Sequence, residues 1–435
     1  MLIQNLSIKN FKCFEEVDVE FAPITLLAGA NSSGKSSLIY SLLAVLQTEQ
    51  FPFYLSPNGK YVNLGGFEEM VYKKDISKII EINIHPFKFS ENYPPKFKWT
   101  WIIDEFNSLP KLESLFFEFE EINLAYGSKF QLDIKSFNEY YKFVLKMYVP
   151  DMRFDQIRRQ LETIDILKPF LSLEKNSLEV EKKFKELSDI YEIYTHPNFL
   201  FRESFEDDFL ISNKNFNYIG SFRQPPERTY YQKAKAQSKV GTDGAGYIDQ
   251  IIEWEETNPT KLAELAKIMS ELELFKEIKS NKFKGGRFEL AVKTQENSEL
   301  AALTDVGFGI SQFLPIIVAD LQLNDNSCLA LSQPEIHLHP KIQALFGNFL
   351  ANQIKHTQKQ YIVETHSEYL LNRIRLLLVK GELKPGDVRV YYFENDGIKT
   401  TTHKVEFATD GQIKNAPDSF FDTYAVDVMD IALNA

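Results

Sequence analysis

The sequence predicts an α/β fold in which strands and helices alternate around a buried central strand. A short apolar run at residues 24–28 enters a glycine-containing loop, and apolar residues then recur at helical spacing from Leu38 to Leu46. Residues 303–435 alternate between short apolar runs and helical patterns, as expected for strands joined by helices. Residues 6–21 contain two segments of alternating apolar and polar residues, which predict an antiparallel hairpin.

The composition is that of a packed globular protein. The chain has 435 residues, of which 44% are hydrophobic, and its 36 Phe and 20 Tyr supply apolar surface for a core. The formal net charge of −12 argues against a protein whose whole surface wraps nucleic acid, because such binding depends on neutralising phosphates. A local basic groove is compatible with this charge, so nucleic acid stays an open but not a required partner.

The two cysteines and the lengths of the apolar runs indicate the cellular compartment in which the protein works. Cys13 and Cys328 both lie in apolar stretches, so we expect buried free thiols rather than a disulfide framework or a cysteine metal site. The chain does not begin with a basic segment followed by an apolar run, and no segment reaches about 18 uninterrupted apolar residues. We therefore expect a soluble, cytoplasmic protein with no membrane partner.

Residues 71–215 differ in character from the rest of the chain, being rich in Lys, Glu, Phe and Tyr. Val180, Phe184, Leu187 and Tyr191 have helical spacing, so we expect strands followed by a mainly helical insertion. The stripe does not persist over three or four heptads, which argues against a long coiled coil. The helix either packs on its own domain or forms an arm that recognises a partner.

A loop-rich segment follows at residues 216–247. Within it, Arg223 and Arg228 flank two prolines, where they could contact a phosphate or a partner or form a structural salt bridge. Beyond it, the pattern predicts helices over residues 248–280 and a strand over residues 288–292.

The loop after residues 24–28 has the composition of a phosphate-binding loop. Gly29, Gly34, Lys35 and Ser36 fit the pattern G-x4-G-K-S. Glycines allow consecutive backbone N–H groups to curl around phosphate oxygens, and the following helix directs its positive end at them. Lys35 would reach the β- and γ-phosphates, and the Ser36 hydroxyl would ligate Mg²⁺. The sequence therefore predicts ATP and Mg²⁺ as cofactors. Further candidate contacts to the nucleotide are Asn31, Ser32, Ser33 and Ser37.

Four segments carry a resemblance to a known family. They are "IKNFKCF" near the start, "GANSSGKSS" at the glycine loop, and "QPEIHLHP" and "ETHSEYLLNRI" further on. Together they resemble the AAA15/AAA21 group of predicted ATPases, which is related to the structural-maintenance-of-chromosomes (SMC) and overcoming-lysogenization-defect (OLD) families. The resemblance covers roughly residues 1–65 and 218–435, and residues 410–422 resemble a small C-terminal domain of unknown function attached to one branch of the group.

The resemblance implies an ABC-type P-loop ATPase head, with a mixed sheet, an antiparallel sheet near the adenine and the mainly helical insertion. The chain would then consist of an N-terminal part of the head, the insertion, a C-terminal part of the head and a small appendage. The corresponding boundaries are residues 1–70, 71–215, 216–390 and 391–435. Two heads are expected to hold ATP between them, head to tail, so the chain should form at least a homodimer.

By the same resemblance, His366 occupies the switch position that contacts the γ-phosphate, and residues 337–340 occupy the loop that touches the opposite subunit. Gly307, Gly309 and Ser311 lie where ABC proteins keep the signature loop, which caps the ATP of the other subunit through backbone N–H groups and a helix N-terminus. Gly307 stands where most members have serine, so polar capping must come from the backbone or from Ser311. A plain helix N-cap is the alternative for this loop, and a histidine metal pair is the alternative for residues 337–340.

The end of the predicted strand at residues 328–331 departs from the family pattern. A working ABC site has two acidic residues there, one for Mg²⁺ and one that polarises the attacking water, whereas this chain has Ser332 and Gln333. Neither carries a carboxylate that could act as a general base, although a glutamine can position a water. In one reading hydrolysis is slow and ATP holds a long-lived dimer together; in the other, Glu335 or Glu364 supplies the missing carboxylate. We expect ATP binding with weak hydrolysis. The candidate catalytic residues are Gln333, Glu335 and His366.

Three functions are compatible with this site. The first is the sensor or scaffold of a prokaryotic anti-phage defence system that acts with a separate effector, such as a nuclease or a toxin. OLD proteins carry their own C-terminal nuclease domain, for which the ~68 residues after Ser367 are too few. The second is an SMC-like DNA-repair or DNA-loading ATPase, which would need a basic groove. The third is a non-hydrolysing interaction scaffold stabilised by ATP. We favour the first.

Overall fold

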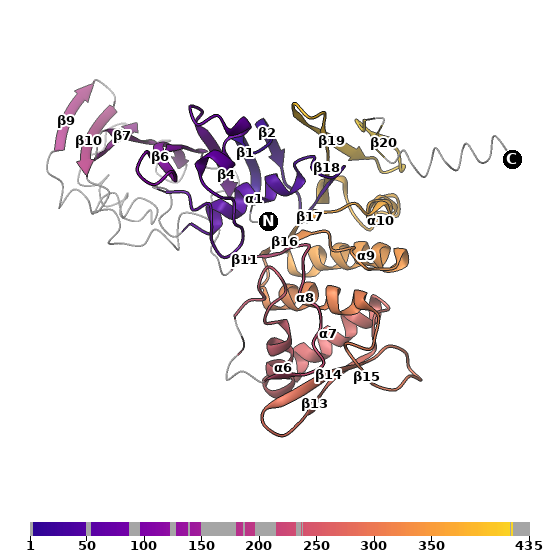
Figure 1. The fold of residues 1–435 in the computed structure, drawn as a ribbon. Helices are drawn as coiled ribbons and strands as arrows, with labels where there is room; N and C mark the ends of the chain where they lie inside the picture. Colours follow the sequence, from indigo (N-terminus) through magenta and orange to yellow (C-terminus); the bar gives the residue numbers. More distant parts are fainter. Residues whose placement is uncertain are drawn as a thin grey trace. The chain divides into compact units, whose positions relative to one another are not determined.

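The chain folds into two compact units, which the computed structural model describes over most of their length (Figure 1). One unit contains residues 21–36 and 214–435, and the other contains residues 2–20 and 37–213. The described residues are 3–48, 54–86, 96–121, 128–137, 140–148, 180–185, 188–195, 215–231, 236, 238–417 and 419–420.

The first unit is organised around a mixed sheet. Its described strands form seven positions in the order β11-β16-β17-β3-β18-β19-β20. The five strands from β11 to β18 pair in parallel, and β19 and β20 continue the sheet in antiparallel pairs. The strands are β3 (Ile24–Gly29), β11 (Phe216–Ile219), β16 (Cys328–Ser332), β17 (Gln360–Glu364), β18 (Val388–Asn395), β19 (Thr400–Phe407) and β20 (Ile413–Lys414).

Every residue of β3, β11, β16 and β17 is buried, which explains why these strands have continuous apolar runs rather than alternation. The apolar run at residues 24–28 therefore has the central position that its sequence predicts, between β17 and β18.

Helices and a small second sheet complete this unit. The helices are α6 (Tyr247–Thr257), α7 (Pro259–Glu271), α8 (Phe308–Gln322), α9 (Pro340–Thr357), α10 (Glu368–Val379) and the 3₁₀ turn η5 (Pro385–Asp387). The small sheet contains β12 (Tyr230–Tyr231), β13 (Glu277–Lys282), β14 (Arg287–Lys293) and β15 (Ala301–Ala302). The helix starts follow from local chemistry: Asn258, His339 and Ser367 each accept a backbone N–H of the first turn.

A buried polar cluster joins α8 to β17. Asp320 is fully buried in α8 and accepts hydrogen bonds from the Lys359 ammonium at 3.1 Å and the Tyr361 hydroxyl at 2.7 Å. Lys359 also donates to the Asp320 carbonyl at 2.7 Å. Because a buried carboxylate is costly unless it is paired, this cluster determines how α8 lies against the strand that ends in Glu364.

The second unit is built on an antiparallel sheet. Within the described residues the strand order is β2-β1-β4-β5-β6-β7-β8-β10-β9, and all its pairs are antiparallel. The strands are β1 (Ile3–Phe11), β2 (Phe14–Glu20), β4 (Ile80–Pro86), β5 (Lys96–Ile103), β6 (Pro110–Glu121), β7 (Ser128–Phe137), β8 (Tyr140–Tyr148), β9 (Val180–Lys185) and β10 (Ser188–Thr195). The predicted N-terminal hairpin is confirmed as β1 and β2. The helical elements are α1 (Lys35–Leu46), of which residues 37–46 belong to this unit, α2 (Phe67–Met70) and η1 (Tyr72–Lys74).

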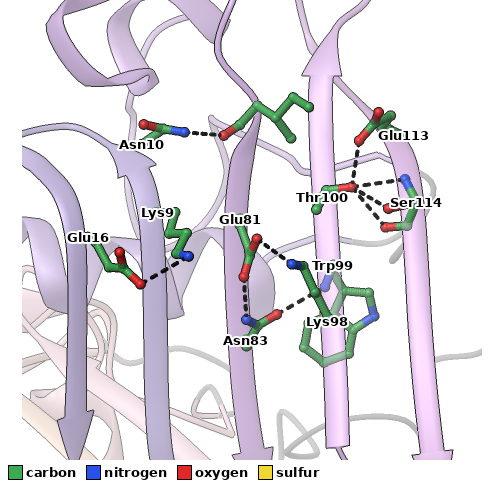
Figure 2. Close-up of polar contacts among 11 residues, drawn as sticks. Lys9, Asn10, Glu16, Glu81, Asn83, Lys98, Trp99, Thr100, Glu113 and Ser114 are labelled. Carbon is green, nitrogen blue, oxygen red and sulfur yellow. Dashed lines mark hydrogen bonds and ion pairs between the residues drawn. The ribbon is translucent and has the colours of Figure 1, made fainter.

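The two faces of this sheet differ in chemistry. Ile82 pairs with Trp99 and Ile80 pairs with Trp101, and all four side chains are fully buried. Polar contacts cross between strands at the alternate positions (Figure 2). They are Lys9–Glu16 at 3.0 Å, Lys98–Glu81 at 3.0 Å and Thr100–Ser114 at 2.7 Å, while Asn83 donates to Glu81 of its own strand at 3.0 Å. One face therefore supplies the apolar core and the other supplies cross-strand polar pairing.

The expected helix over residues 180–191 is wrong. Residues 180–185 and 188–195 form the antiparallel strands β9 and β10, and Leu187 lies outside the described residues. Most of the described part of the predicted helical insertion consists of strands, while residues 149–179 and 196–214 also lie outside the description.

The structure also bears on the predictions made for the cysteines, for the boundary at residue 390 and for membrane-spanning helices. Cys328 is a buried free thiol as predicted, whereas Cys13 lies in the turn after β1 and is only partly buried. The boundary predicted at residue 390 falls inside β18, a strand of the first unit's sheet. In the part of the chain that the structure describes, no helix has the length and apolar character needed to cross a membrane.

Replacing Trp101 by alanine should destabilise the protein by about 3–5 kcal/mol, because the indole is fully buried and leaves a cavity. Phe106→Ala is the matched control, since the Phe106 side chain is fully exposed and its loss should change little. Chemical denaturation followed by circular dichroism measures both free energies of unfolding. Equal effects of the two substitutions would contradict this assignment of the core.

Candidate functional site

The glycine loop connects the carboxyl end of β3 to the first turn of α1. Gly29 and Gly34 have φ values of +132° and +109°, where side chains other than glycine are strained. A Cβ atom at Gly29 would collide with the Phe393 carbonyl oxygen of the neighbouring β18. Glycine is therefore required at this position both for the backbone conformation and for the pairing of β3 with β18.

The Lys35 side chain is folded against this loop. It is 3% exposed, and its ammonium donates hydrogen bonds to the carbonyl oxygens of Gly29 at 3.0 Å and Ala30 at 2.6 Å. Burial lowers the pKa of Lys35 from its ordinary value. The cation is thus held at the mouth of the loop, with no carboxylate directly bonded to it among the described residues.

Other loop residues fit an anionic ligand as well. The Ser33 hydroxyl is buried and has no hydrogen-bond partner in the described part of the protein, which is costly unless a ligand supplies one. Asn31 and Ser32 are exposed at the loop tip, and Gly34, Ser36 and Ser37 are half-buried. A buried ammonium, an unpaired hydroxyl and a helix N-terminus at one loop match what a phosphate chain requires.

The Glu364 carboxylate bridges the glycine loop and the end of β16. The Ser36 hydroxyl donates to Glu364 Oε1 at 2.7 Å, and the Ser332 hydroxyl donates to Glu364 Oε2 at 2.8 Å. The Tyr218 hydroxyl lies 3.1 Å from Ser332 Oγ. Glu364 is 5% exposed and Ser332 is 4% exposed, so this chain of hydrogen bonds is buried.

Arg223 braces the turn that follows β16. Its guanidinium donates to the carbonyl oxygens of Ser332 at 3.0 Å, Gln333 at 2.7 Å and Gln312 at 3.0 Å. Burial lowers the pKa of Arg223 to about 10. Because these contacts occupy the guanidinium, the residue ties β16 to α8. Arg228 instead forms an ion pair with Asp305, an exposed pair of the kind that contributes little to stability.

The turn after β16 holds two of the candidate catalytic residues. Gln333 has a φ of +48° and its backbone N–H donates to the Glu364 carbonyl at 2.7 Å. Glu335 Oε1 accepts the backbone N–H of His366 at 2.6 Å. Strained backbone of this kind persists where surrounding contacts impose it, and functional sites are common examples.

Glu335 and His366 have shifted titration behaviour. Burial raises the pKa of the Glu335 carboxyl above its ordinary value, although hydrogen bonds from the backbone of His366 and from Thr365 oppose the shift. Partial desolvation and the charge of Lys35 lower the pKa of His366. A carboxyl group with a raised pKa therefore contacts the backbone of His366, a residue whose imidazole has a lowered pKa.

The predicted signature loop packs against the histidine loop. Gly307 is the N-cap of α8, and a Cβ atom at Gly309 would lie 2.6 Å from the His337 carbonyl oxygen. The rings of Phe308 and His337 meet edge to face, with centroids 4.9 Å apart. The Ser311 hydroxyl is buried and donates to the Phe308 carbonyl at 2.8 Å, so the backbone N–H groups of the first turn are the polar groups left at this helix start.

The histidine loop shows no metal centre in the region that the structure describes. His339 Nδ1 accepts the Lys341 backbone N–H and so caps α9. No cluster of three or more His, Cys, Asp or Glu side chains suited to a metal ion occurs among the described residues.

The structure brings most of the predicted site together. Parallel strands β3, β16 and β17 end at one edge of the sheet, which places the glycine loop beside Ser332, Gln333 and His366. The sequence identifies Glu364 only as one of two sources for a carboxylate, and it predicts neither the two hydrogen bonds of this side chain nor the contacts of Arg223 with the turn after β16. The signal for Glu364 was an acidic residue immediately before Thr365-His366-Ser367 at a strand end.

Comparisons with known proteins support the motif resemblance. A family model described as AAA ATPase domain matches residues 1–371, including the region 66–217 that the motifs left uncovered. Among solved structures, the SMC head domain from Thermotoga maritima is 14% identical with a TM-score of 0.37, and 93% of this chain and 100% of that chain are covered. The Smc head domain with an extended coiled coil bound to the C-terminal domain of ScpA, derived from Pyrococcus furiosus, is 10% identical with a TM-score of 0.39, and 100% and 99% are covered. A search of the curated proteins found no match. Both TM-scores lie below 0.5, so the assignment rests on the family match.

Gly309→Ala should destabilise the protein by about 1–3 kcal/mol, because the added methyl group meets the His337 carbonyl. Gly307→Ala is the matched control, since a Cβ atom there meets nothing within 4 Å. Thermal and denaturant unfolding of the two variants tests the contact. If Gly309→Ala proves as stable as Gly307→Ala, the two loops do not pack as described.

Proposed function

Because the chain belongs to the AAA15-type AAA ATPase family, we propose that it binds Mg-ATP at the loop from Gly29 to Ser37 and that two copies associate head to tail around the nucleotide. The observation that carries this proposal is the buried Lys35 ammonium, which is held over the loop carbonyls between β3 and α1. The Ser33 hydroxyl, which has no hydrogen-bond partner among the described residues, gives independent support, because a phosphate oxygen would supply one.

The binding roles follow from the chemistry of each group. The backbone N–H groups from Asn31 to Ser36 would surround the phosphates, with Lys35 releasing its carbonyl contacts to meet their charge. Ser36 would help to hold Mg²⁺, and the ion would supply positive charge that offsets the negative charge of the phosphates. His366 lies at the same edge of the sheet, where a neutral imidazole can donate a hydrogen bond to a terminal phosphate oxygen.

Hydrolysis at this site is proposed to be slow. β16 ends in Ser332 and is followed by Gln333, and neither residue has a carboxylate that could act as a general base. Glu335 is the nearest acid in the turn, and its raised pKa suits a base, but its hydrogen bond to the His366 backbone holds one oxygen in place. ATP would then act mainly to hold the dimer, with Gln333 positioning a water and Glu335 supporting residual turnover.

Formation of the dimer would be the step through which ATP binding acts on a partner protein. In the proposed head-to-tail arrangement, the start of α8 with Gly307 and Gly309 presents backbone N–H groups to the nucleotide of the other copy. The family resemblance supports a role as the sensor or scaffold of an anti-phage defence system, acting on a separate effector such as a nuclease or toxin. Co-purification of an effector only when ATP is present would support this role; binding of an effector equally well without ATP would contradict ATP gating.

Lys35→Ala should weaken ATP binding at least about tenfold, because a buried cation facing the phosphates is lost. Lys355→Ala on the exposed side of α9 is the control for a general change of charge. Isothermal titration calorimetry with a slowly hydrolysed ATP analogue measures both affinities. Unchanged binding by Lys35→Ala, with the native fold retained, would contradict the assigned nucleotide site.

Gln333→Glu should raise phosphate release at least about tenfold, because it places a carboxylate directly after β16. Glu335→Gln should reduce the residual rate of the wild-type protein further. A continuous phosphate-release assay at saturating Mg-ATP compares the three proteins. The slow-hydrolysis account fails if Gln333→Glu leaves the rate unchanged.

A further inference from the structure

Two residues at adjacent strand ends differ in whether they can supply the negative charge that a nucleotide-bound magnesium needs. β16 ends in Ser332, which has no charge, and β17 ends in Glu364, which has one. The strand register pairs these two residues directly. We infer that Glu364, at the end of β17 rather than β16, is the carboxylate of the magnesium site, and that Ser332 supports it through a hydrogen bond. This inference rests on the proposed function, since it concerns the cation that accompanies ATP.

The strand order allows a carboxylate at the end of β17 to reach the glycine loop. β17 lies between β16 and β3, so its end is the nearer of the two to the glycine loop that follows β3. Glu364 pairs with Leu27 of β3 on one side and with Ser332 on the other. A carboxylate at this position therefore needs no movement of the backbone to reach Ser36.

The hydrogen bonds orient the Ser36 hydroxyl for a cation. Ser36 donates its proton to Glu364 Oε1 at 2.7 Å, which leaves the lone pairs of Ser36 Oγ free to face a metal ion. The second carboxylate oxygen accepts from Ser332 at 2.8 Å, and Tyr218 lies 3.1 Å behind Ser332. Supporting hydrogen bonds of this kind set the orientation of a metal-binding group.

The charge of the site fits magnesium. Mg²⁺ is typically held by one or two carboxylates together with phosphate oxygens and waters. Glu364 is 5% exposed, and its hydrogen-bond partners in the structure are the neutral hydroxyls of Ser36 and Ser332. The Lys35 ammonium interacts with Glu364 electrostatically, but among the described residues no cation is hydrogen-bonded to this carboxylate. A buried carboxylate in that position is costly, and a divalent ion at Ser36 would offset more of the cost.

This assignment separates the two acids that the sequence left as alternatives. Glu364 contacts Ser36, the predicted magnesium ligand, whereas Glu335 contacts the backbone of His366. Glu364 is thus the acid that would bind the cation, and Glu335 is the acid that holds the turn beside His366. The end of β16 therefore carries no carboxylate that could serve as a general base, while Glu364 supplies the carboxylate of the magnesium site.

The test compares ATP binding in EDTA with binding in Mg²⁺, and adds Mn²⁺ affinity measured by electron paramagnetic resonance as a readout independent of turnover. Glu364→Gln keeps the size of the side chain and its capacity for hydrogen bonds. The double variant S332D/E364S returns the carboxylate to β16. Glu382→Gln, in an exposed loop after α10, is the matched control for loss of one acid.

Glu364→Gln should bind ATP in EDTA as the wild type does. Its Mn²⁺ affinity should be at least about tenfold lower, and the increase in ATP affinity that Mg²⁺ causes should be at least about tenfold smaller. S332D/E364S should recover most of that loss. The control and Glu335→Gln should keep the wild-type response to both ions.

The inference is overturned if Glu364→Gln responds to both ions as the wild type does. It is also overturned if the folded double variant recovers nothing, or if Glu335→Gln instead of Glu364→Gln loses the response. If Glu364→Gln does not fold, the Mn²⁺ affinity and the Mg²⁺ dependence of ATP binding of the double variant decide whether the inference holds. Failure of the proposed function would look different, because the wild-type protein would then bind no ATP in either EDTA or Mg²⁺.

Discussion

The parallel pairing of β3 with β17 on one side and β18 on the other determines where the candidate site can form. Parallel strands end at the same edge of a sheet, so the loop after β3 meets the residues that follow β16 and β17. β18 passes so close to Gly29 that no side chain fits there. The glycine that a phosphate loop needs for its backbone N–H groups is thus also required by the sheet itself.

The second constraint is that the polar groups at this edge are buried and must be satisfied within the protein or by a ligand. Arg223 supplies hydrogen-bond donors to three carbonyl groups at the end of β16 and in α8. Between α8 and β17, the Asp320 carboxylate is satisfied by hydrogen bonds from Lys359 and Tyr361. Both clusters connect the helix of the predicted signature loop to the strands of the nucleotide site. The Ser33 hydroxyl remains unsatisfied among the described residues, and it lies in the loop where a phosphate is expected.

The local parts of this arrangement could be predicted from the sequence. The run at residues 24–28, the loop from Gly29 and the helix after it have short-range signals, and the strands before Ser332 and Glu364 have buried apolar runs. The contact between Ser36 and Glu364 could not be predicted in this way, because it joins residues 328 positions apart and depends on the order of strands in the sheet. The helical spacing of Val180, Phe184, Leu187 and Tyr191 misled because four apolar residues over twelve positions also fit two short strands.

The central claim is that Mg-ATP joins two copies of this chain and is hydrolysed slowly. The most direct measurement is the mass of the 50.4 kDa protein in solution by light scattering, with and without Mg-ATP, together with phosphate release from the same sample. The account predicts that Mg-ATP doubles the mass and that release stays well below about 10 s⁻¹ per site, an ordinary turnover rate for an enzyme. A mass that does not respond to Mg-ATP, or release near that ordinary rate, would contradict it.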